Sequence, residues 1–308
     1  MPDYVSLSNV FIDDILLWDG QIFIGVLGGA GVHAVAGARV WSDSLGLIAS
    51  IGRDFEDDFL KRLTDLGLDL SMLFEMQEKT TRAWQIFQPD EERIEVFRDK
   101  NNLVHQLSLT EIEIPEAYRT AKGYHFHFSG SPQQVVENLN IIRGFNPKNT
   151  IVMEPSFSPV AWGEADYRQV FSLVDVFSPN TIEGHDITGE SDPQKVINVL
   201  LDWGAHRVAL RMGEQGSLLA EQDRKFIFVP PVKETIVDVT GAGNAYLGGM
   251  LVGLCNGLPF SEAAIWGAVS ASFAIEQFGI CLFNESMIES RNRRLERAKS
   301  QLRFVDER

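Results

Sequence analysis

The sequence predicts an α/β protein with a doubly wound, mostly parallel sheet, helices on both of its faces and a small lid of strands. Strand patterns alternate with helix patterns through residues 123–219, as parallel βαβ units require. Two strongly alternating stretches, at about 11–24 and 80–98, are too short to bury a core of their own. A length of 308 residues suits one such domain. We therefore expect one domain over 1–308, with the two stretches inserted as the lid.

The composition restricts the class of protein and its partners. A hydrophobic content of 44% and a charged content of 23% are typical of a globular protein. The formal net charge of −16 argues against a nucleic-acid partner. The sequence has no apolar run long enough to span a membrane, so we expect no membrane partner. Cys255 and Cys281 lie in apolar surroundings, which predicts buried thiols and a cytoplasmic location.

The first predicted strand, residues 4–10, is followed at once by two carboxylates, Asp13 and Asp14. Either side chain can accept hydrogen bonds from hydroxyl groups of a ligand, and a solvated turn explains the local sequence equally well. An Asp-Gly pair between two short apolar runs predicts a hairpin over 15–24.

Residues 26–41 combine a glycine-rich turn with a helix pattern. Gly28 and Gly29 precede the helix and allow a ligand to approach the backbone, although they could also simply pack the helix on the sheet. His33 can bond a hydroxyl group. We do not expect it to bind a metal, because no second His or Cys stands at ligand spacing.

Residues 45–69 read as a strand, a turn and an amphipathic helix, with Asp54 as the expected N-cap. Alternation over 80–97 around a Pro-Asp turn predicts two further lid strands. Trp84 and Phe87 contact a ligand, contact a partner subunit or pack between the lid strands.

The middle of the chain begins with a strand over 123–130, a helix over 131–145 and a strand over 150–157. His125 and His127 alternate with aromatic residues on the first of these strands. We expect them to be hydrogen-bonded sheet residues rather than metal ligands.

Two polar patterns follow predicted strands in the second half of the chain. Asn180 and Glu183 can supply oxygen ligands to a hard cation, or they can form a capping box at a helix start. Arg211 precedes a turn with Gly213 and Gly216. Its guanidinium can reach a phosphate group or pair with a carboxylate.

An extended β-branched run over 235–239, the glycine turn 241–243 and an apolar helix closing at an Asn-Gly pair follow one another. This order directs backbone N–H groups and the positive end of a helix dipole at one point, which suits phosphate. A packing turn is the alternative. A helix over 258–279 capped by Ser261, and a solvated basic helix in the tail, complete the chain.

The segment DVTGAGNAYLGG, residues 238–249, resembles the C-terminal signature of the ribokinase-like (PfkB) carbohydrate kinases, D-T-x-G-A-G-D-x-F-x-x-G. Asp238, the G-A-G turn and Gly249 match. The family's catalytic base is the Asp after G-A-G, and Asn244 stands in its place.

Three other segments resemble the family in the family's order. Residues 28–33 resemble the first six positions of G-G-x-G-x-N-x-A, with Gly28, Gly29 and Gly31 matching and His33 in place of Asn, and residues 179–183 match P-N-x-x-E. Arg211 replaces the Thr of x-V-T-x-G-x-x-G, and Glu154 stands where the family tends to carry Asp.

The resemblance implies ATP-dependent phosphorylation of a primary hydroxyl on a small sugar, polyol or nucleoside, with Mg²⁺ and a candidate K⁺ site. It also implies a candidate homodimer through the lid. The site residues that it implies are Gly241, Ala242 and Gly243 for an anion hole; Asn244 at the base position; Asp14, chosen over Asp13, with Gly28, Gly29 and His33 for the substrate; Asn180, Glu183, Arg211, Gly213, Gly216 and Gly279 for the nucleotide; Glu183 for Mg²⁺ through water; and Asp238 and Thr240 for the monovalent cation.

The substitution at Asn244 leaves two interpretations open. An amide has no useful basicity, and general-base catalysis contributes roughly 10²–10⁴-fold, so one reading is a slow kinase in which another carboxylate or water accepts the proton. The alternative is a catalytically inactive pseudokinase that binds nucleotide or sugar and acts through regulation or assembly. A purely structural domain would leave the glycine turns and the N-x-x-E pair unexplained.

Overall fold

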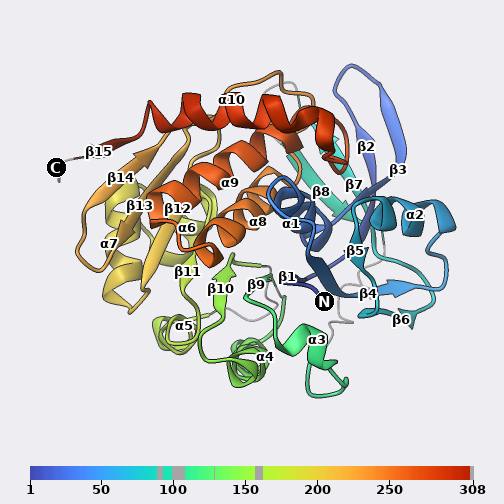
Figure 1. The fold of residues 1–308 in the computed structure, drawn as a ribbon, viewed down its shortest axis with the longest axis horizontal. Helices are drawn as coiled ribbons and strands as arrows, with labels where there is room; N and C mark the ends of the chain where they lie inside the picture. The colour runs from blue at the N-terminus through green and yellow to red at the C-terminus, as the bar shows by residue number, and fades with distance from the viewer. Residues whose placement is uncertain (89–92, 99–107, 128, 157–161, 306–308) are drawn as a thin grey trace.

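The computed structural model describes residues 1–88, 93–98, 108–127, 129–156 and 162–305. Its main feature is an 11-stranded sheet in the order β15-β14-β13-β12-β11-β10-β9-β1-β4-β5, with β6 beside β4 (Figure 1). The strands from β12 through β5 run parallel, and β13, β14 and β15 continue the sheet as an antiparallel edge. Their bounds are β1 Tyr4–Leu7, β4 Leu45–Gly52, β5 Leu68–Asp69, β6 Leu73–Gln77, β9 Gly123–Phe126, β10 Thr150–Met153, β11 Val176–Phe177, β12 Arg207–Arg211, β13 Ser217–Glu221, β14 Phe226–Val229 and β15 Arg303–Val305.

Helices cover both faces of this sheet. One hydrophobic core lies between the sheet and α1, α8 and α9, and a second lies between the sheet and α3, α4, α5 and α7 (Figure 1). Successive strand residues divide between the two cores: Val152 joins the first, and Ile151 and Met153 join the second. The helices are α1 Ala30–Arg39, α2 Asp57–Asp65, α3 Glu116–Arg119, α4 Pro132–Phe145, α5 Glu164–Phe171, α6 Thr181–Thr188, α7 Pro193–Asp202, α8 Ala242–Cys255, α9 Phe260–Ala274 and α10 Ile288–Lys299. The predicted doubly wound α/β fold is confirmed.

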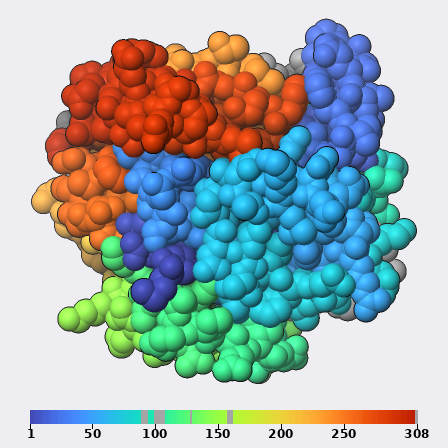
Figure 2. Space-filling model, turned by 45° about the vertical axis from the view of Figure 1, so that its right-hand side comes forward, coloured from blue at the N-terminus to red at the C-terminus, as the bar shows by residue number. Residues whose placement is uncertain are grey.

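A second, four-stranded sheet has the order β3-β2-β7-β8. Its strands are β2 Phe11–Leu16, β3 Ile22–Gly28, β7 Arg82–Phe87 and β8 Arg93–Phe97. The predicted hairpin is confirmed as β2–β3, which projects at one end of the molecule (blue in Figure 2). The Phe23 and Phe278 rings, 4.0 Å apart, join this hairpin to the segment after α9. The Pro89-Asp90 turn lies outside the described residues.

The two faces of the small sheet differ in chemistry. Asp14 pairs with Trp84, and Trp84 pairs with Val96, so these three residues share one face. Trp84 and Val96 are exposed there. The neighbouring residue Asp13 pairs with Ala83 on the opposite face. Alternation along β2 therefore separates the two aspartates that the sequence presents side by side.

Two expected helix caps are wrong. Asp54 does not cap α2, whose N-cap is Glu56. Its carboxylate instead accepts from the Thr80 backbone N–H at 2.6 Å and pairs with Arg82 at 3.3 Å, which ties the turn after β4 to β7. Ser261 does not cap α9, because the helix starts at Phe260 and its N-cap is Pro259.

Two features of the C-terminal third depend on tertiary contacts. The extended run 235–239 joins neither sheet: the backbone N–H groups of Val237 and Asp238 both bond to the Ile275 carbonyl at the end of α9. The terminal helix is not wholly solvated. Arg294 is buried, pairs with Glu276 at 2.7 Å and lies 3.9 Å from the centre of the Phe273 ring.

Candidate active site

A cavity of about 1420 Å³ opens at the carboxyl ends of the parallel strands. Glu154 follows β10, Asn180 follows β11, and Arg211 ends β12, and all three line it. The small sheet closes the other end of the cavity with Asp13 and Gln85. In open α/β folds this edge of the sheet is where ligands bind. The end at the strand termini, with Glu154, Asn180 and Arg211, is called below the phosphate end. The end at the small sheet, with Asp13 and Gln85, is called the acceptor end.

The phosphate end is built around the first turn of α8. Gly241 is the N-cap with φ +75°, a left-handed conformation that suits glycine. Residues 241–244 all line the cavity. The first N–H groups of a helix have no partner within it, so this turn directs backbone donors and the positive end of the helix dipole at the cavity.

Gly243 leaves room for a close approach of the Arg211 side chain. A Cβ at this position would lie 1.8 Å from Nη1 of Arg211. The guanidinium therefore lies directly against the glycine turn 241–243, which is called below the anion turn. For Arg211 the sequence left open contact with either a phosphate or a carboxylate.

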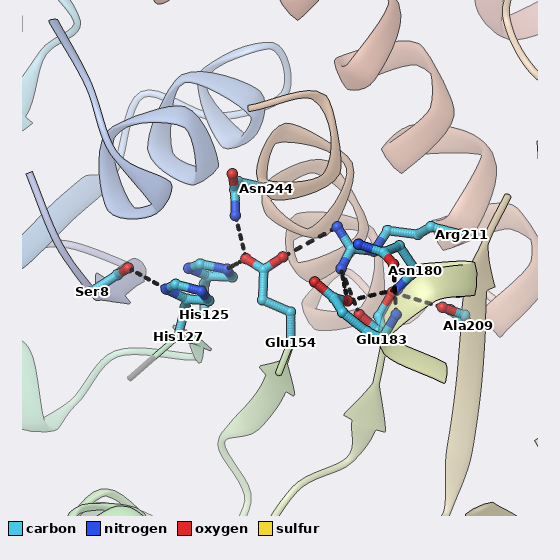
Figure 3. Close-up of polar contacts among 10 residues, drawn as sticks. Ser8, His125, His127, Glu154, Asn180, Glu183, Ala209, Arg211 and Asn244 are labelled. Carbon is cyan, nitrogen blue, oxygen red and sulfur yellow. Dashed lines mark hydrogen bonds and ion pairs between the residues drawn. The ribbon is translucent and has the colours of Figure 1, made fainter. Parts of the chain in front are cut away.

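Arg211 is held between two carboxylates. Its Nη1 lies 3.2 Å from Glu154 Oε2 and its Nη2 lies 3.3 Å from Glu183 Oε2 (Figure 3). Nη2 also donates to the Ser178 carbonyl at 2.8 Å. The sequence left carboxylate pairing open, and the structure contains it.

Glu154 is the centre of a buried polar cluster. Its Oε1 accepts from Asn244 Nδ2 and lies 2.9 Å from His125 Nε2, while Oε2 faces Arg211 (Figure 3). Burial acts to raise the pKa of Glu154, but the Arg211 charge and the His125 hydrogen bond outweigh it and hold this pKa well below its usual range. Glu154 is therefore an ionised hydrogen-bond acceptor at neutral pH.

The two strand histidines are hydrogen-bonded, as expected. His125 Nδ1 lies 2.8 Å from Ser6 Oγ. His127 Nδ1 lies 3.3 Å from Ser8 Oγ (Figure 3). Burial lowers the pKa of His127 to about 4, so this imidazole is neutral at physiological pH.

Asn180 and Glu183 form the capping box that the sequence offered as an alternative. The Asn180 Oδ1 accepts from the Glu183 N–H at 2.9 Å, and Glu183 Oε2 accepts from the Asn180 N–H at 2.7 Å. Both residues also line the cavity, so capping and ligand contact do not exclude each other. Burial raises the pKa of Glu183, although Arg211 acts in the opposite direction.

Oxygen donors of the kind that Mg²⁺ prefers line the phosphate end: Glu154, Glu183 and Asp186. Among the described residues, no group of three or more His, Cys, Asp and Glu side chains converges as a metal cage. The donor set thus fits a cation that keeps several waters and is brought in with phosphate groups.

At the acceptor end, the residue that faces the cavity is Asp13. Gln85 Nε2 donates to Asp13 Oδ1 at 3.0 Å and to Glu95 Oε1 at 2.8 Å, and all three residues line the cavity. Because the Asp13 and Glu95 carboxylates both accept from the Gln85 amide nitrogen, the Gln85 amide oxygen, Oε1, is left for other contacts. This oxygen is buried and has no hydrogen-bond partner within the described part of the chain.

The choice of Asp14 over Asp13 as a substrate-binding residue does not fit the structure, because Asp14 does not line the cavity. Its Oδ1 accepts from the Gly25 N–H at 3.0 Å, and its Oδ2 pairs with Arg98 at 2.8 Å. The reason is the alternation of β2, which turns Asp13 inward and Asp14 to the other face.

The glycine pair before α1 is divided in role. Gly29 lines the cavity and has φ +97°. Gly28 does not line it, but its missing side chain leaves room for Asp13 Oδ2, which lies 2.2 Å from where a Cβ would be. His33 is buried and lines the cavity from α1.

The remaining predicted residues do not all meet at the cavity. Gly213, Gly216 and Thr240 line it. Asp238 is buried behind the turn, where its Oδ1 accepts from the Thr240 N–H at 2.8 Å. Gly279 lies away from the cavity, because a Cβ there would meet Val26 of β3 at 2.8 Å.

Sequence reasoning missed Gln85 and Glu95, and it gave Glu154 no role in the site. The period-2 alternation of 80–98 carried a signal for the first two, since polar side chains recur on one face of strands that are otherwise apolar. Nothing local marks Glu154, because its importance comes from Asn244 and Arg211, which lie far away in the sequence.

Within the described residues, no helix is long and apolar enough to cross a membrane.

Comparison with known proteins gives consistent matches over most of the chain. The family model described as pfkB family carbohydrate kinase matches residues 23–287. A cytidine kinase from Thermococcus kodakarensis is 31% identical over 281 residues, which cover 91% of this chain and 98% of that protein. An E. coli protein assigned as ribokinase II, solved with ATP and Mg²⁺, superposes with a TM-score of 0.75 at 18% identity over 96% of this chain and 100% of the other. A fructokinase double mutant from Vibrio cholerae, solved with fructose, ADP and potassium ion, superposes with a TM-score of 0.76 at 21% identity over 94% of this chain and 97% of the other.

Proposed function

Because the chain belongs to the pfkB family of carbohydrate kinases, we propose that it transfers the γ-phosphoryl group of ATP to a primary hydroxyl of a small sugar, polyol or nucleoside. One observation carries the proposal: a single cavity has acceptor groups for hydroxyls at one end and the N-terminal turn of α8 at the other. Phosphoryl transfer depends mainly on positioning and on stabilising charge. Both needs are met by groups that this cavity brings together.

The acceptor end suits a neutral, hydroxyl-rich substrate. Asp13, Glu95 and the Gln85 amide oxygen are hydrogen-bond acceptors, which bind hydroxyl or amino hydrogens. Among the described lining residues, the cations are Arg211 and Lys233, and neither belongs to the small sheet. A substrate that carries its own carboxylate or phosphate would meet repulsion at this end. We therefore place neutral pentoses, hexoses, polyols and nucleosides first.

The proposal includes Mg²⁺ brought with ATP, with Glu183 as its ligand through water, and a monovalent cation near Asp238 and Thr240. Mg²⁺ would supply charge that neutralises the phosphates. Gly241 and Gly243 would donate backbone N–H groups to the transferred phosphoryl group. The Ala242 N–H, also expected in the anion hole, instead donates to the Val239 carbonyl at 3.2 Å. Asn180, Arg211, Gly213 and Gly216 would contact the nucleotide.

The small sheet is proposed to be a lid over the acceptor and a homodimer contact. Its cavity face is polar, while its other face exposes Ile22, Trp84, Ile94 and Val96. An exposed apolar sheet face of this kind is typical of an interaction surface. A cytoplasmic location completes the proposal, supported by two free thiols, Cys255 and Cys281, whose pKa values burial raises to about 11.

A second function, that of a pseudokinase, is favoured by one specific observation. The Asn244 amide, at the position of the family base, donates to Glu154 instead of offering a proton acceptor. A protein of this kind would bind nucleotide or sugar and act through regulation or assembly.

Two measurements on the purified protein separate these functions. The first is the melting temperature with Mg·ATP or Mg·ADP, where ligand at 100 times its dissociation constant stabilises by about 2.7 kcal/mol. The second is ADP production with a panel of neutral sugars, polyols and nucleosides. Binding with turnover supports the kinase, binding without turnover on any acceptor supports the pseudokinase, and no binding of any purine nucleotide contradicts both.

A further inference from the structure

The proposed kinase needs a group that takes the proton of the acceptor hydroxyl, and neither the residue at the position of the family base, Asn244, nor its hydrogen-bond partner Glu154 offers one. The Asn244 carboxamide cannot be protonated usefully, and its Nδ2 already donates to Glu154. Glu154 is ionised but accepts hydrogen bonds from Asn244 and His125 and pairs with Arg211. A carboxylate stabilised in this way is a weak base. The proton acceptor must come from elsewhere in the cavity.

His33 lies against the anion turn. A Cβ at Gly241 would be 2.1 Å from Cγ, 2.2 Å from Nδ1 and 2.4 Å from Cδ2 of the His33 ring. The imidazole therefore covers the N-cap residue of α8, where the backbone donors for the phosphoryl group begin. Gly241 must be glycine for this contact as well as for its positive φ.

Asp13 approaches the other side of the same ring. A Cβ at Gly28 would lie 2.2 Å from Asp13 Oδ2 and 3.6 Å from His33 Nε2. Both side chains are buried to the same extent, each with 3% of its surface exposed, and both line the cavity. The imidazole thus lies between the carboxylate of the acceptor end and the turn of the phosphate end. The reacting hydroxyl must also lie between these two ends for its oxygen to meet the γ-phosphorus.

We propose that His33 is the proton acceptor of the transfer and that the nearby Asp13 carboxylate stabilises the imidazolium that forms. This inference rests on the proposed kinase function. The acceptor hydroxyl oxygen forms a bond to the γ-phosphorus, the bond from that phosphorus to the β–γ bridging oxygen breaks, and ADP leaves with the electron pair. The hydroxyl proton goes to the imidazole nitrogen on the Gly241 side. The resulting imidazolium then faces the Asp13 carboxylate.

The chemistry of the pair suits this role. A neutral imidazole has one ring nitrogen with a free lone pair, which can accept a proton. A carboxylate near an imidazole stabilises the cation that forms when the ring takes up a proton. The His at position 33 thus offsets the loss of the carboxylate at position 244, and both positions adjoin the same turn.

The test is the substitution His33→Gln, which keeps a side chain of similar size but removes the base. We expect kcat for ADP production with the best acceptor to fall by about 10²-fold or more. The rise in melting temperature with Mg·ADP should stay close to wild type, because His33 is not among the proposed nucleotide contacts. The acceptor KM should also stay close to wild type, because Asp13, Gln85 and Glu95 still line the acceptor end. The control is His206→Gln, since His206 is exposed and outside the cavity, and it should leave kcat unchanged.

The substitution Asp13→Asn is a second test of the proposed His33–Asp13 pair. It should lower kcat and also raise the acceptor KM, because Asp13 both faces the ring and lines the acceptor end. His33→Gln should lower kcat alone. A rise in the acceptor KM only, with kcat unchanged, would show that Asp13 does not stabilise the imidazolium.

Each outcome decides the inference. If His33→Gln turns over like wild type, His33 is not the proton acceptor, while the kinase function survives. If turnover and nucleotide-linked stabilisation disappear together in that variant, His33 is a packing residue of the anion turn and the inference fails. If wild type binds nucleotide but turns over none of the neutral acceptors, the kinase function itself fails, and the inference fails with it.

Discussion

The two ends of the cavity are built in different ways. At the phosphate end, backbone groups of residues 241–244 face the cavity, and the surrounding charges of Arg211, Glu154 and Glu183 already pair with one another. At the acceptor end, side chains of the small sheet face the cavity, and the acceptors of Asp13 and Glu95 meet a single amide donor. The phosphate end should therefore be sensitive to added side-chain volume and to charge imbalance. The acceptor end should be sensitive to which face of a strand a side chain occupies.

The largest expected effect is at the phosphate end, with Arg211→Thr. It leaves Glu154 buried without its cation, and breaking such a pair costs about 3–5 kcal/mol of unfolding free energy. In the folded wild type the pKa of Glu154 lies below its ordinary value of 4.5, so the pair stabilises the fold at pH values above that and less as the pH falls. The stability deficit of the variant in chemical denaturation should accordingly be largest at neutral pH and shrink in acid.

A suitable control is Arg207→Thr on the same strand, whose ion pair with Glu221 is largely exposed and should contribute only about 0–1 kcal/mol. Equal losses for the two variants would mean that the cluster around Glu154 is no more important than a surface ion pair.

The second effect is on ligand binding, with Gly243→Ala. Because the new Cβ would lie 1.8 Å from Arg211 Nη1, either the guanidinium or the turn must move. We expect most of the nucleotide-linked stabilisation, about 2.7 kcal/mol at 100 times the dissociation constant, to be lost in a melting experiment. Gly144→Ala in α4 is the matched helical control, since a Cβ there meets open space. Retained nucleotide binding in Gly243→Ala would show that the turn is only a packing corner.

The third effect concerns Asn244→Asp, which restores the residue of the family signature. The new carboxylate would face Glu154 Oε1, the atom to which the Asn244 amide now donates, and two carboxylates at this distance must share a proton. We expect a loss of stability rather than a gain in rate from this substitution alone.

Adding Glu154→Gln should recover about 2 kcal/mol in a double-mutant cycle on unfolding free energy, within the range found for residues in contact. The Gln amide would then donate to the carboxylate introduced at position 244, which reverses the present bond. Additive effects of the two substitutions would contradict the direct contact, and a faster enzyme from Asn244→Asp alone would show that the missing base limits the rate.

The smallest effect tests the acceptor end with neighbouring residues on opposite faces of β2. Asp13→Asn should weaken acceptor binding by about 1.5 kcal/mol, roughly tenfold in KM, because a hydrogen bond to a charged group is lost. Asp14→Asn should leave the acceptor KM unchanged and destabilise the small sheet by about 1.5 kcal/mol, because the buried Asp14 loses its charged contact with Arg98. A reversal of this pattern in steady-state kinetics would mean that the register of β2 against β7 has been assigned to the wrong face.

Local patterns in the sequence were enough to predict the backbone of the site. The alternation of strands and helices predicted the doubly wound sheet, and the glycines around position 241 predicted the turn at the start of α8. The Asn180–Glu183 spacing predicted a capping box as one of two readings. These features depend on residues within a few positions of one another, so short-range rules on turns, caps and periodicity are sufficient for them.

Local patterns did not predict which partner a segment or side chain finds in the folded chain. The β-branched run 235–239 has the composition of a strand, but a strand exists only where another strand pairs with it, and here the backbone bonds to the end of α9. Asp54 has the chemistry of an N-cap, yet the Thr80 N–H, 26 positions away, takes its carboxylate.

The sequence by itself determined which chemical groups are present and which backbone turns direct N–H groups at a ligand, because φ preferences and periodicity act over a few residues. Only the tertiary structure decided that Asp13 rather than Asp14 faces the cavity, since alternation defines two faces but not which one is covered. It also decided that Asn244, Glu154 and Arg211 form one cluster. Their contacts join α8, β10 and β12, so they follow from the order in which the strands assemble, which no local spacing records.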